Sequence, residues 1–134
     1  MSTWATRRQM MIAGMMGAIC ATLRGQDDGA KAAVDSVLKL YDAAEYGQLY
    51  DTRFHDSMKQ QMTREQWIAA ARQIARQTGK VVNRTVAKQA KSMGIVRFIF
   101  NTQCAEGKVW EDLSVQRDGE DWKVIGFWVR PNLE

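Results

Sequence analysis

The sequence is poor in the residues that build metal centres and disulfide frameworks. Its 134 residues include one histidine, His55, and two cysteines, Cys20 and Cys104. A zinc-type site takes about four ligands, so one histidine cannot build a multi-histidine site, and we expect no metal. Cys20 lies in an apolar N-terminal stretch, which leaves Cys104 without an intrachain disulfide partner in the folded part. We expect Cys104 to be a buried small hydrophobic residue or a site of intermolecular pairing.

Signals of nucleotide chemistry and nucleophilic catalysis are also missing. The ten glycines are scattered, so the chain has no glycine-rich loop that would cradle a phosphate. A cysteine–histidine nucleophile would need Cys104 and His55 to meet in space, and nothing in the sequence brings them together. His55 stands beside Asp56 and is expected on the surface. We therefore assign no catalytic residue and no cofactor, and we favour a function other than catalysis.

The first 25 residues have the parts of an export signal: a basic start, an apolar middle and small residues near the end. Arg7 and Arg8 precede an uncharged run from Met10 to Leu23. That run is shorter than the roughly 20 residues of a membrane-spanning helix. The paired arginines resemble the twin-arginine signal. We predict that residues 1–25 are a signal peptide or N-terminal anchor of an exported, periplasmic protein. The alternative is anchorage to the inner membrane by residues 10–23.

The excess of positive charge belongs mostly to this leader. The chain has 19 basic and 15 acidic residues, and three of the arginines, but none of the acids, precede Gln26. Residues 26–134 therefore carry a net charge of only +1. A nucleic-acid-binding domain needs a basic stripe on its folded part. We expect no nucleic-acid partner, and membrane contact only through the N-terminal segment if it is uncleaved.

Three helices are predicted in the first half of the remaining chain. Apolar residues recur at helical spacing over residues 30–41, and a shorter apolar pattern covers residues 46–54. The third helix has the clearest start, because Thr63 and Gln66 form a capping box. Its end is marked by Gly79, which suits a left-handed cap.

After Gly79 the apolar period changes from 3.6 to 2, which predicts strands. Short loops separate the last three strands, so we expect antiparallel pairing. The expected fold is α+β: three N-terminal helices packed on a curved four-stranded antiparallel sheet, within one domain of residues 26–134 and preceded by a signal-like helix. The predicted strands are Val81–Lys88, Ile95–Thr102, Val109–Gln116 and Trp122–Arg130.

Several short patterns between Ala30 and Arg130 carry a family resemblance. They are Leu38 to Asp42 with Tyr46 and Tyr50, Thr63 with Gln66 and Trp67, Gly79 to Thr85, Glu111, and Asp118 to Arg130 with its Trp-Lys-Val-x-Gly-Phe run. Together they resemble the bacterial domain-of-unknown-function family 4019. Ala44 and Leu49 depart from the family pattern. The resemblance implies a cystatin-like or nuclear-transport-factor-like cone fold and an exported protein, and it implies no known activity.

Glu111 is an acidic residue on a strand face that is otherwise apolar. By alternation it shares that face with Val109 and Leu113. A buried acid is costly unless it is paired or protonated. We expect a structural ion pair with an arginine that closes one end of the sheet. The alternatives are an acid in a pocket near a tyrosine, and an exposed Glu111. The candidate pocket or structural polar residues are Glu111, Arg84, Arg130, Gln66, Tyr41, Tyr46 and Tyr50.

Aromatic residues are frequent on the last two strands. Strict alternation points Trp122 and Trp128 to one face and Phe127 to the other, so both faces of the last strand would be aromatic. An exposed aromatic patch usually marks an interaction site. We expect a homodimer or an envelope protein partner on the outer sheet face, or coverage by the N-terminal segment. The candidate interaction surface consists of Trp110, Trp122, Phe127 and Trp128.

These features favour an exported small binding or interaction module, with a small apolar ligand as one expected occupant. Two alternatives remain open at the level of sequence. One is a small cone-fold enzyme of the isomerase or dehydratase type, with Glu111 as its acid or base. The other is a structural subunit of an envelope complex, anchored in the membrane by its N-terminus.

Overall fold

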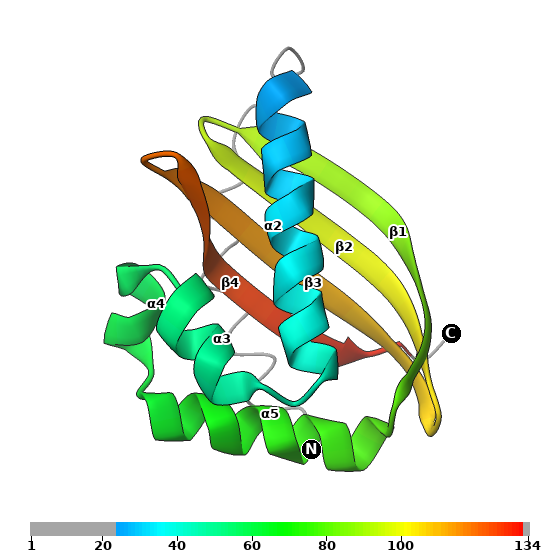
Figure 1. The fold of residues 1–134 in the computed structure, drawn as a ribbon. Helices are drawn as coiled ribbons and strands as arrows, with labels where there is room; N and C mark the ends of the chain where they lie inside the picture. The colour runs from blue at the N-terminus through cyan, green and yellow to red at the C-terminus, as the bar shows by residue number, and fades with distance from the viewer. Residues whose placement is uncertain (1–23, 133–134) are drawn as a thin grey trace.

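Helices precede strands in the part of the chain that the structure, a computed structural model, describes: residues 24–132 (Figure 1). The predicted signal or anchor lies outside these residues, apart from Arg24 and Gly25, which begin the first described helix. The elements are α2 (Arg24–Asp42), α3 (Tyr46–Arg53), α4 (Asp56–Gln61), α5 (Arg64–Thr78), β1 (Val81–Ser92), β2 (Ile95–Cys104), β3 (Gly107–Asp118) and β4 (Asp121–Pro131).

The described residues form four helices, so the prediction of three was wrong by one. The additional helix, α4, has six residues, too few for a 3.6-residue period to be seen in the sequence. Its start is fixed by a side chain, because the Ser57 N–H donates to Nδ1 of His55 at 3.0 Å. None of the helices within residues 24–132 is long and apolar enough to span a membrane.

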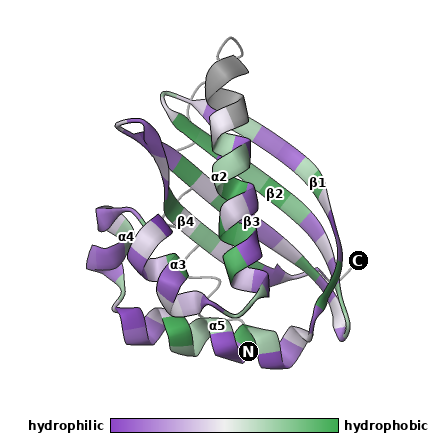
Figure 2. Ribbon diagram, viewed as in Figure 1, coloured by the Kyte–Doolittle hydropathy of each residue, from purple (hydrophilic) through white to green (hydrophobic). Residues whose placement is uncertain are grey.

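The four strands form one antiparallel sheet in the order β1-β2-β3-β4, as the short loops predicted. The four helices of residues 24–132 lie on one side of this sheet, with α2 running across its middle (Figure 1). Hydrophobic residues gather on the strands beneath α2 (Figure 2). Burial of that apolar surface between the helical layer and the sheet is the main stabilising contribution to a fold of this type.

An aromatic cluster around Trp67 joins α5, α3 and the end of α2 to the sheet. The Trp67 ring centroid lies 4.9 Å from that of Phe54 and 5.7 Å from that of Phe127, and 6.4 Å from those of both Tyr41 and Tyr46. The indole Nε1–H donates to the Tyr46 carbonyl oxygen at 2.9 Å, so the one polar atom of the ring is satisfied. This cluster fixes the end of α2 and the start of α3 against β4.

A β-bulge in β4 changes which side chains face the helices. Ser114 pairs with Gly126 and Val115 pairs with Val124, so Ile125 has no cross-strand partner of its own. One extra residue reverses the alternation of side chains beyond it. The face of a β4 residue therefore depends on which side of Ile125 it lies.

The bulge overturns the predicted faces of the β4 aromatics. Trp122 and Phe127 both lie in the core between the sheet and the helices. Trp128 pairs with Asp112 and points to the opposite face of the sheet. The prediction that Trp122 and Trp128 share a face was wrong, because strict alternation does not hold across the bulge.

Candidate functional site

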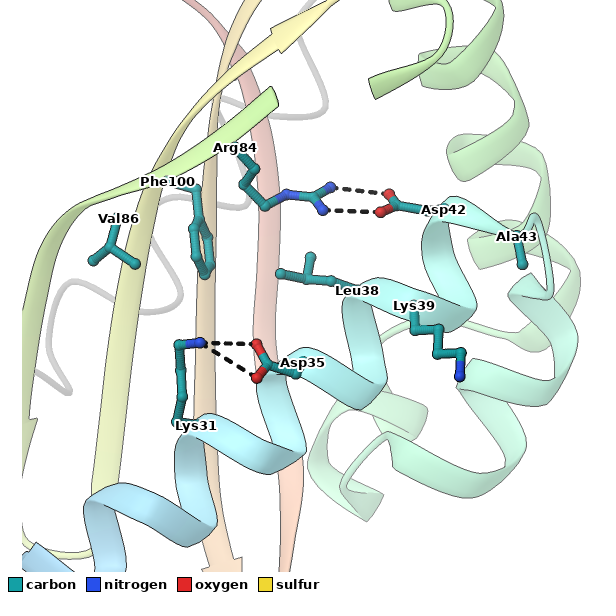
Figure 3. A pocket seen from close by; sticks show the side chains of 9 residues that line it. All are labelled: Lys31, Asp35, Leu38, Lys39, Asp42, Ala43, Arg84, Val86 and Phe100. Carbon is teal, nitrogen blue, oxygen red and sulfur yellow. Dashed lines mark hydrogen bonds and ion pairs between the residues drawn. The ribbon is translucent and has the colours of Figure 1, made fainter. Parts of the chain in front are cut away.

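A guanidinium held between two carboxylates lies at the edge of the helical layer. Arg84, on β1, donates to Glu111 on β3, with Nε to Oε1 at 2.6 Å and Nη2 to Oε2 at 3.1 Å. It also donates to Asp42, the last residue of α2, from Nη1 and Nη2 at 2.9 Å each (Figure 3). Both pairs are bidentate, the geometry that gives arginine–carboxylate bonds their strength and direction. Arg84 therefore ties β1 to α2 and to β3 at once.

Thr102 completes the surroundings of Glu111. Its hydroxyl donates to Glu111 Oε1 at 2.6 Å, and both residues are buried, with Glu111 only 1% exposed. The carboxylate thus accepts three hydrogen bonds, two of them from a cation. Such bonding offsets the cost of removing a charge from water. Burial alone would lower the pKa of Arg84, but hydrogen bonds to Asp42 and Glu111 raise it overall, so the guanidinium stays charged.

A cavity of about 340 Å³ lies beside this cluster, between the end of α5, the start of β1 and the strands β3 and β4. Glu111 and Asp42 line one side, and Val81, Val109 and Val129 supply apolar wall. The cavity is thus mainly apolar, with a polar corner at the ion-pair cluster.

Tyr41 and Tyr46 also line this cavity. Both side chains are buried overall, but neither hydroxyl is among the fully buried polar atoms that lack a hydrogen-bond partner. Burial above all, and then the nearby charge of Glu111, raises the pKa of Tyr41. Burial also raises the pKa of Tyr46, while the charge of Arg72 opposes that shift. Both phenols are therefore neutral at physiological pH and able to donate a hydrogen bond into the cavity.

The buried Cys104 lies on the cavity wall as a thiol rather than a thiolate. Burial raises its pKa, and the charge of Glu111 acts in the same direction, while a hydrogen bond with Thr78 opposes both. A protonated thiol is a weak nucleophile. His55, which caps α4, does not line the cavity, so the two residues of a cysteine–histidine pair are not brought together.

A second, more open hollow of about 600 Å³ lies on the other side of Arg84, between α2 and β1 (Figure 3). Leu38, Val86 and Phe100 line it with apolar side chains. On its α2 side Lys31 donates to Asp35 at 3.0 Å. The Asp42–Arg84 pair stands between this groove and the cavity, since Asp42 lines both.

The structure brings some of the predicted polar residues together and separates others. Glu111, Arg84, Tyr41 and Tyr46 meet at the cavity and the ion-pair cluster. Tyr50 lies apart, donating to the Met62 carbonyl at 2.7 Å, and Gln66 forms the predicted capping box with Thr63. Arg130 pairs across the sheet with Trp110, one position from the Glu111–Val129 pair, so it points to the opposite face from Glu111.

The four aromatics of the predicted interaction surface do not form an exposed patch. Trp122, Phe127 and Trp128 are buried, with Trp128 only 1% exposed, and Trp110 is half-buried. Two of them, Trp122 and Phe127, belong to the core beneath the helices. Three of these rings are therefore not exposed, and a partner on the outer sheet face stays a prediction.

Two residues of the site were missed by sequence reasoning. Thr102 continues the alternating inward positions of Phe98 and Phe100, so a polar side chain on an apolar face was a usable signal. Asp42 follows the last predicted turn of a helix and gave no signal, because its contact with Arg84 spans 42 residues of sequence. Within residues 24–132 the acidic, histidine and cysteine residues form no group that could hold a metal ion.

Fold and site together define a small α+β domain with one helix-covered antiparallel sheet and an ion-pair cluster between a cavity and a groove. The chain belongs to the family described as "Protein of unknown function (DUF4019)", whose model matches residues 33–127. This confirms the family that the sequence resemblance indicated.

Among solved structures the fold is similar to that of Bdellovibrio bacteriovorus Bd1075, with a TM-score of 0.51 and 10% sequence identity. The match covers 78% of this chain and 40% of that chain. This chain thus spans less than half the length of that protein, and at such low identity the likeness is one of fold alone. A comparison with curated protein sequences finds no match.

Proposed function

We propose that this domain is a cone-type binding module that takes a small, largely apolar molecule in the cavity beside Glu111. The observation that carries the proposal is the pair of tyrosines, Tyr41 and Tyr46, that line a mainly apolar cavity beside the charged Glu111. A neutral phenol on a cavity wall can donate a hydrogen bond to a bound molecule. A ligand with one polar group would accept that hydrogen bond. The cavity volume of about 340 Å³ fits a small molecule.

Binding is better supported than acid–base catalysis. A catalytic acid or base must exchange a proton with a substrate atom within hydrogen-bond reach. Both Glu111 oxygens already accept bonds, from Arg84 and Thr102, and a substrate would have to displace one of them. We assign Glu111 a positioning role, in which it fixes Arg84 and the polar corner of the cavity. An exported, periplasmic location remains part of the proposal, supported by the sequence of residues 1–25.

The proposal can be tested by filling the cavity without disturbing the polar cluster. Ala75, on α5, lines the cavity, and Ala69 is exposed on the same helix. We would screen the full chain by saturation-transfer NMR with neutral cyclic ketones and amides, and measure the affinity of any compound that binds. Ala75→Phe should abolish binding and Ala69→Phe should leave it unchanged.

Removing a hydroxyl gives a second measurement. Tyr41→Phe deletes one hydrogen bond to the ligand, worth about 1 kcal/mol, so the affinity should fall roughly fivefold. A compound that binds the Ala75→Phe variant as tightly as the unchanged chain must bind outside the cavity, and this result would contradict the proposed site. Failure of every probe to bind the unchanged chain would contradict the chemistry proposed for the ligand.

A further inference from the structure

Strand β1 leaves one edge of the sheet without a neighbouring strand among residues 24–132. Seven of the eight residues from Val82 to Gln89 are exposed, on both faces of the strand, and only Arg84 is partly buried. The exposed residues include two large hydrophobic ones, Val82 at 69% and Val86 at 47%. Figure 1 shows α2 crossing the middle of the sheet and leaving β1 uncovered at its margin. The backbone donors and acceptors of this edge are a template for another strand.

The opposite edge of the sheet is covered. Phe54 forms a parallel bridge with Val124 of β4, and the His55 N–H donates to the Val124 carbonyl at 2.8 Å. Most of β4 is buried. Among residues 24–132, the chain itself pairs with the β4 edge at Val124, whereas no strand pairs with the outer edge of β1.

The open edge belongs to a segment that carries charge of one sign. From Gln66 to Ala105 the chain contains seven basic residues and no aspartate or glutamate. Lys80 and Lys88 in this segment are exposed. Arg84 and Arg97 of this segment are paired with acids from other elements, so the attraction for a negatively charged partner rests on the exposed lysines Lys80 and Lys88.

The groove between α2 and β1 could hold side chains of a strand that pairs with β1. Its apolar lining of Leu38, Val86 and Phe100 lies next to the open edge (Figure 3). Its two acids are already engaged, Asp35 by Lys31 and Asp42 by Arg84. Lys39 lines the same groove and is exposed. Alternate residues of an added strand would meet apolar side chains and lysines.

We propose that β1 is the docking edge for an extended acidic segment of a partner protein, which adds to the sheet as a fifth strand. Residues 83–86 lie between two irregular pairings of β1 with β2 and pair regularly themselves, so their outer edge offers a regular ladder. A second copy of this chain is a poorer occupant, because antiparallel pairing of two β1 strands would bring like charges together. This site is separate from the cavity proposed above.

The test uses the full chain and three labelled peptides. The first alternates glutamate and valine, the second alternates lysine and valine, and the third repeats the first with N-methyl groups on alternate amides. Fluorescence polarisation measures affinity, and hydrogen exchange measures protection of residues 82–89. The glutamate peptide should bind and slow exchange in that segment, the other two should not bind, and added salt should weaken binding.

Charge reversal supplies the matched variants. Lys88→Glu places an acid on the docking edge. Lys59→Glu reverses a charge on α4, which packs against β4 at the other edge, and also removes the contacts of Lys59 with the Asp51 carbonyl and the Tyr50 ring. We expect Lys88→Glu to weaken binding of the glutamate peptide roughly three- to tenfold and Lys59→Glu to leave it unchanged. Circular dichroism checks that both variants are folded.

Four outcomes would overturn the proposal. They are absence of binding, equal binding of the N-methylated peptide, which would indicate charge attraction alone, equal binding of the lysine peptide, and concentration-dependent self-association that protects residues 82–89. The last outcome would assign the edge to a second copy of this chain.

Discussion

Removing Arg84 should destabilise the protein more than neutralising Glu111, and the difference follows from what each change leaves behind. In Arg84→Met, Glu111 stays 1% exposed and keeps only the Thr102 hydroxyl. Breaking a buried ion pair in this way costs about 3–5 kcal/mol. In Glu111→Gln, Arg84 keeps both bonds to Asp42 and remains partly exposed. We expect that change to cost about 1–3 kcal/mol.

Further variants separate the ion pair from the packing around it. Asp42 is 38% exposed on its side chain, so water can replace Arg84 there, and Asp42→Asn should cost less than about 1 kcal/mol. The triple variant Arg84→Met, Thr102→Val, Glu111→Leu removes every buried polar group of the cluster at once. It should recover most of the stability lost in Arg84→Met, since an apolar replacement leaves no buried charge without a partner.

Urea unfolding at neutral pH, followed by circular dichroism, gives the free energies of unfolding from the midpoint and slope. A loss of 3–5 kcal/mol is a large part of the roughly 5–15 kcal/mol typical of a domain, so Arg84→Met is expected to unfold at much lower urea. Two results would refute the reasoning. One is a loss below about 1 kcal/mol in Arg84→Met. The other is a larger loss in Glu111→Gln than in Arg84→Met.

Three other predictions concern stability. Thr63→Ala removes the cap of α5 and should lower the free energy of unfolding by about 1 kcal/mol in urea titrations. Gly29→Ala places a methyl carbon 2.7 Å from Nε1 of the buried Trp122 and should lower the free energy of unfolding by about 1–3 kcal/mol. As a control, Gly47→Ala should not lower the thermal midpoint, because the added methyl group meets only the movable end of an exposed arginine side chain. Burial raises the pKa of Tyr41, so this tyrosine ionises in the unfolded chain, near pH 10, before it ionises in the folded protein. The free energy of unfolding should therefore fall as pH rises above about 10. Tyr41→Phe should reduce this fall in unfolding titrations from about pH 9 to 11.

Local patterns predicted most of the fold because they depend on neighbours in sequence. The capping box at Thr63 and Gln66 is present with both of its hydrogen bonds, at 3.1 and 2.9 Å. The four strands were predicted from period-2 alternation and extend a few residues beyond the predicted limits. Helix α4 was missed because its start depends on the His55 side chain rather than on a repeating apolar pattern.

Non-local features set the limit of prediction at the site. One acid on an otherwise apolar strand face indicated that Glu111 needs a cationic partner. Side-chain alternation alone left both Arg84 and Arg130 as candidates for that partner. Register decides between them, since Arg130 pairs with Trp110 and so lies on the other face. The bulge at Ile125 reverses which face of the sheet the side chains of β4 point to, and an isoleucine at that position gives no sequence signal of a bulge. Asp42 reaches Arg84 only because α2 crosses the sheet.

Arg84 lies on the proposed docking edge and also holds Glu111 at the polar corner of the cavity, so it adjoins both separate sites and sets a physical condition on how they can interact. It lies on β1, within the segment that an added strand would pair with, and its guanidinium holds the carboxylate at the polar corner of the cavity. Any coupling between the two must be reciprocal, because linkage requires each ligand to change the affinity of the other by the same factor. Coupling also requires Arg84 to occupy two arrangements. Bidentate bonds to both Asp42 and Glu111 hold it in one, so the cavity and the β1 edge are expected to bind independently while those four contacts remain intact.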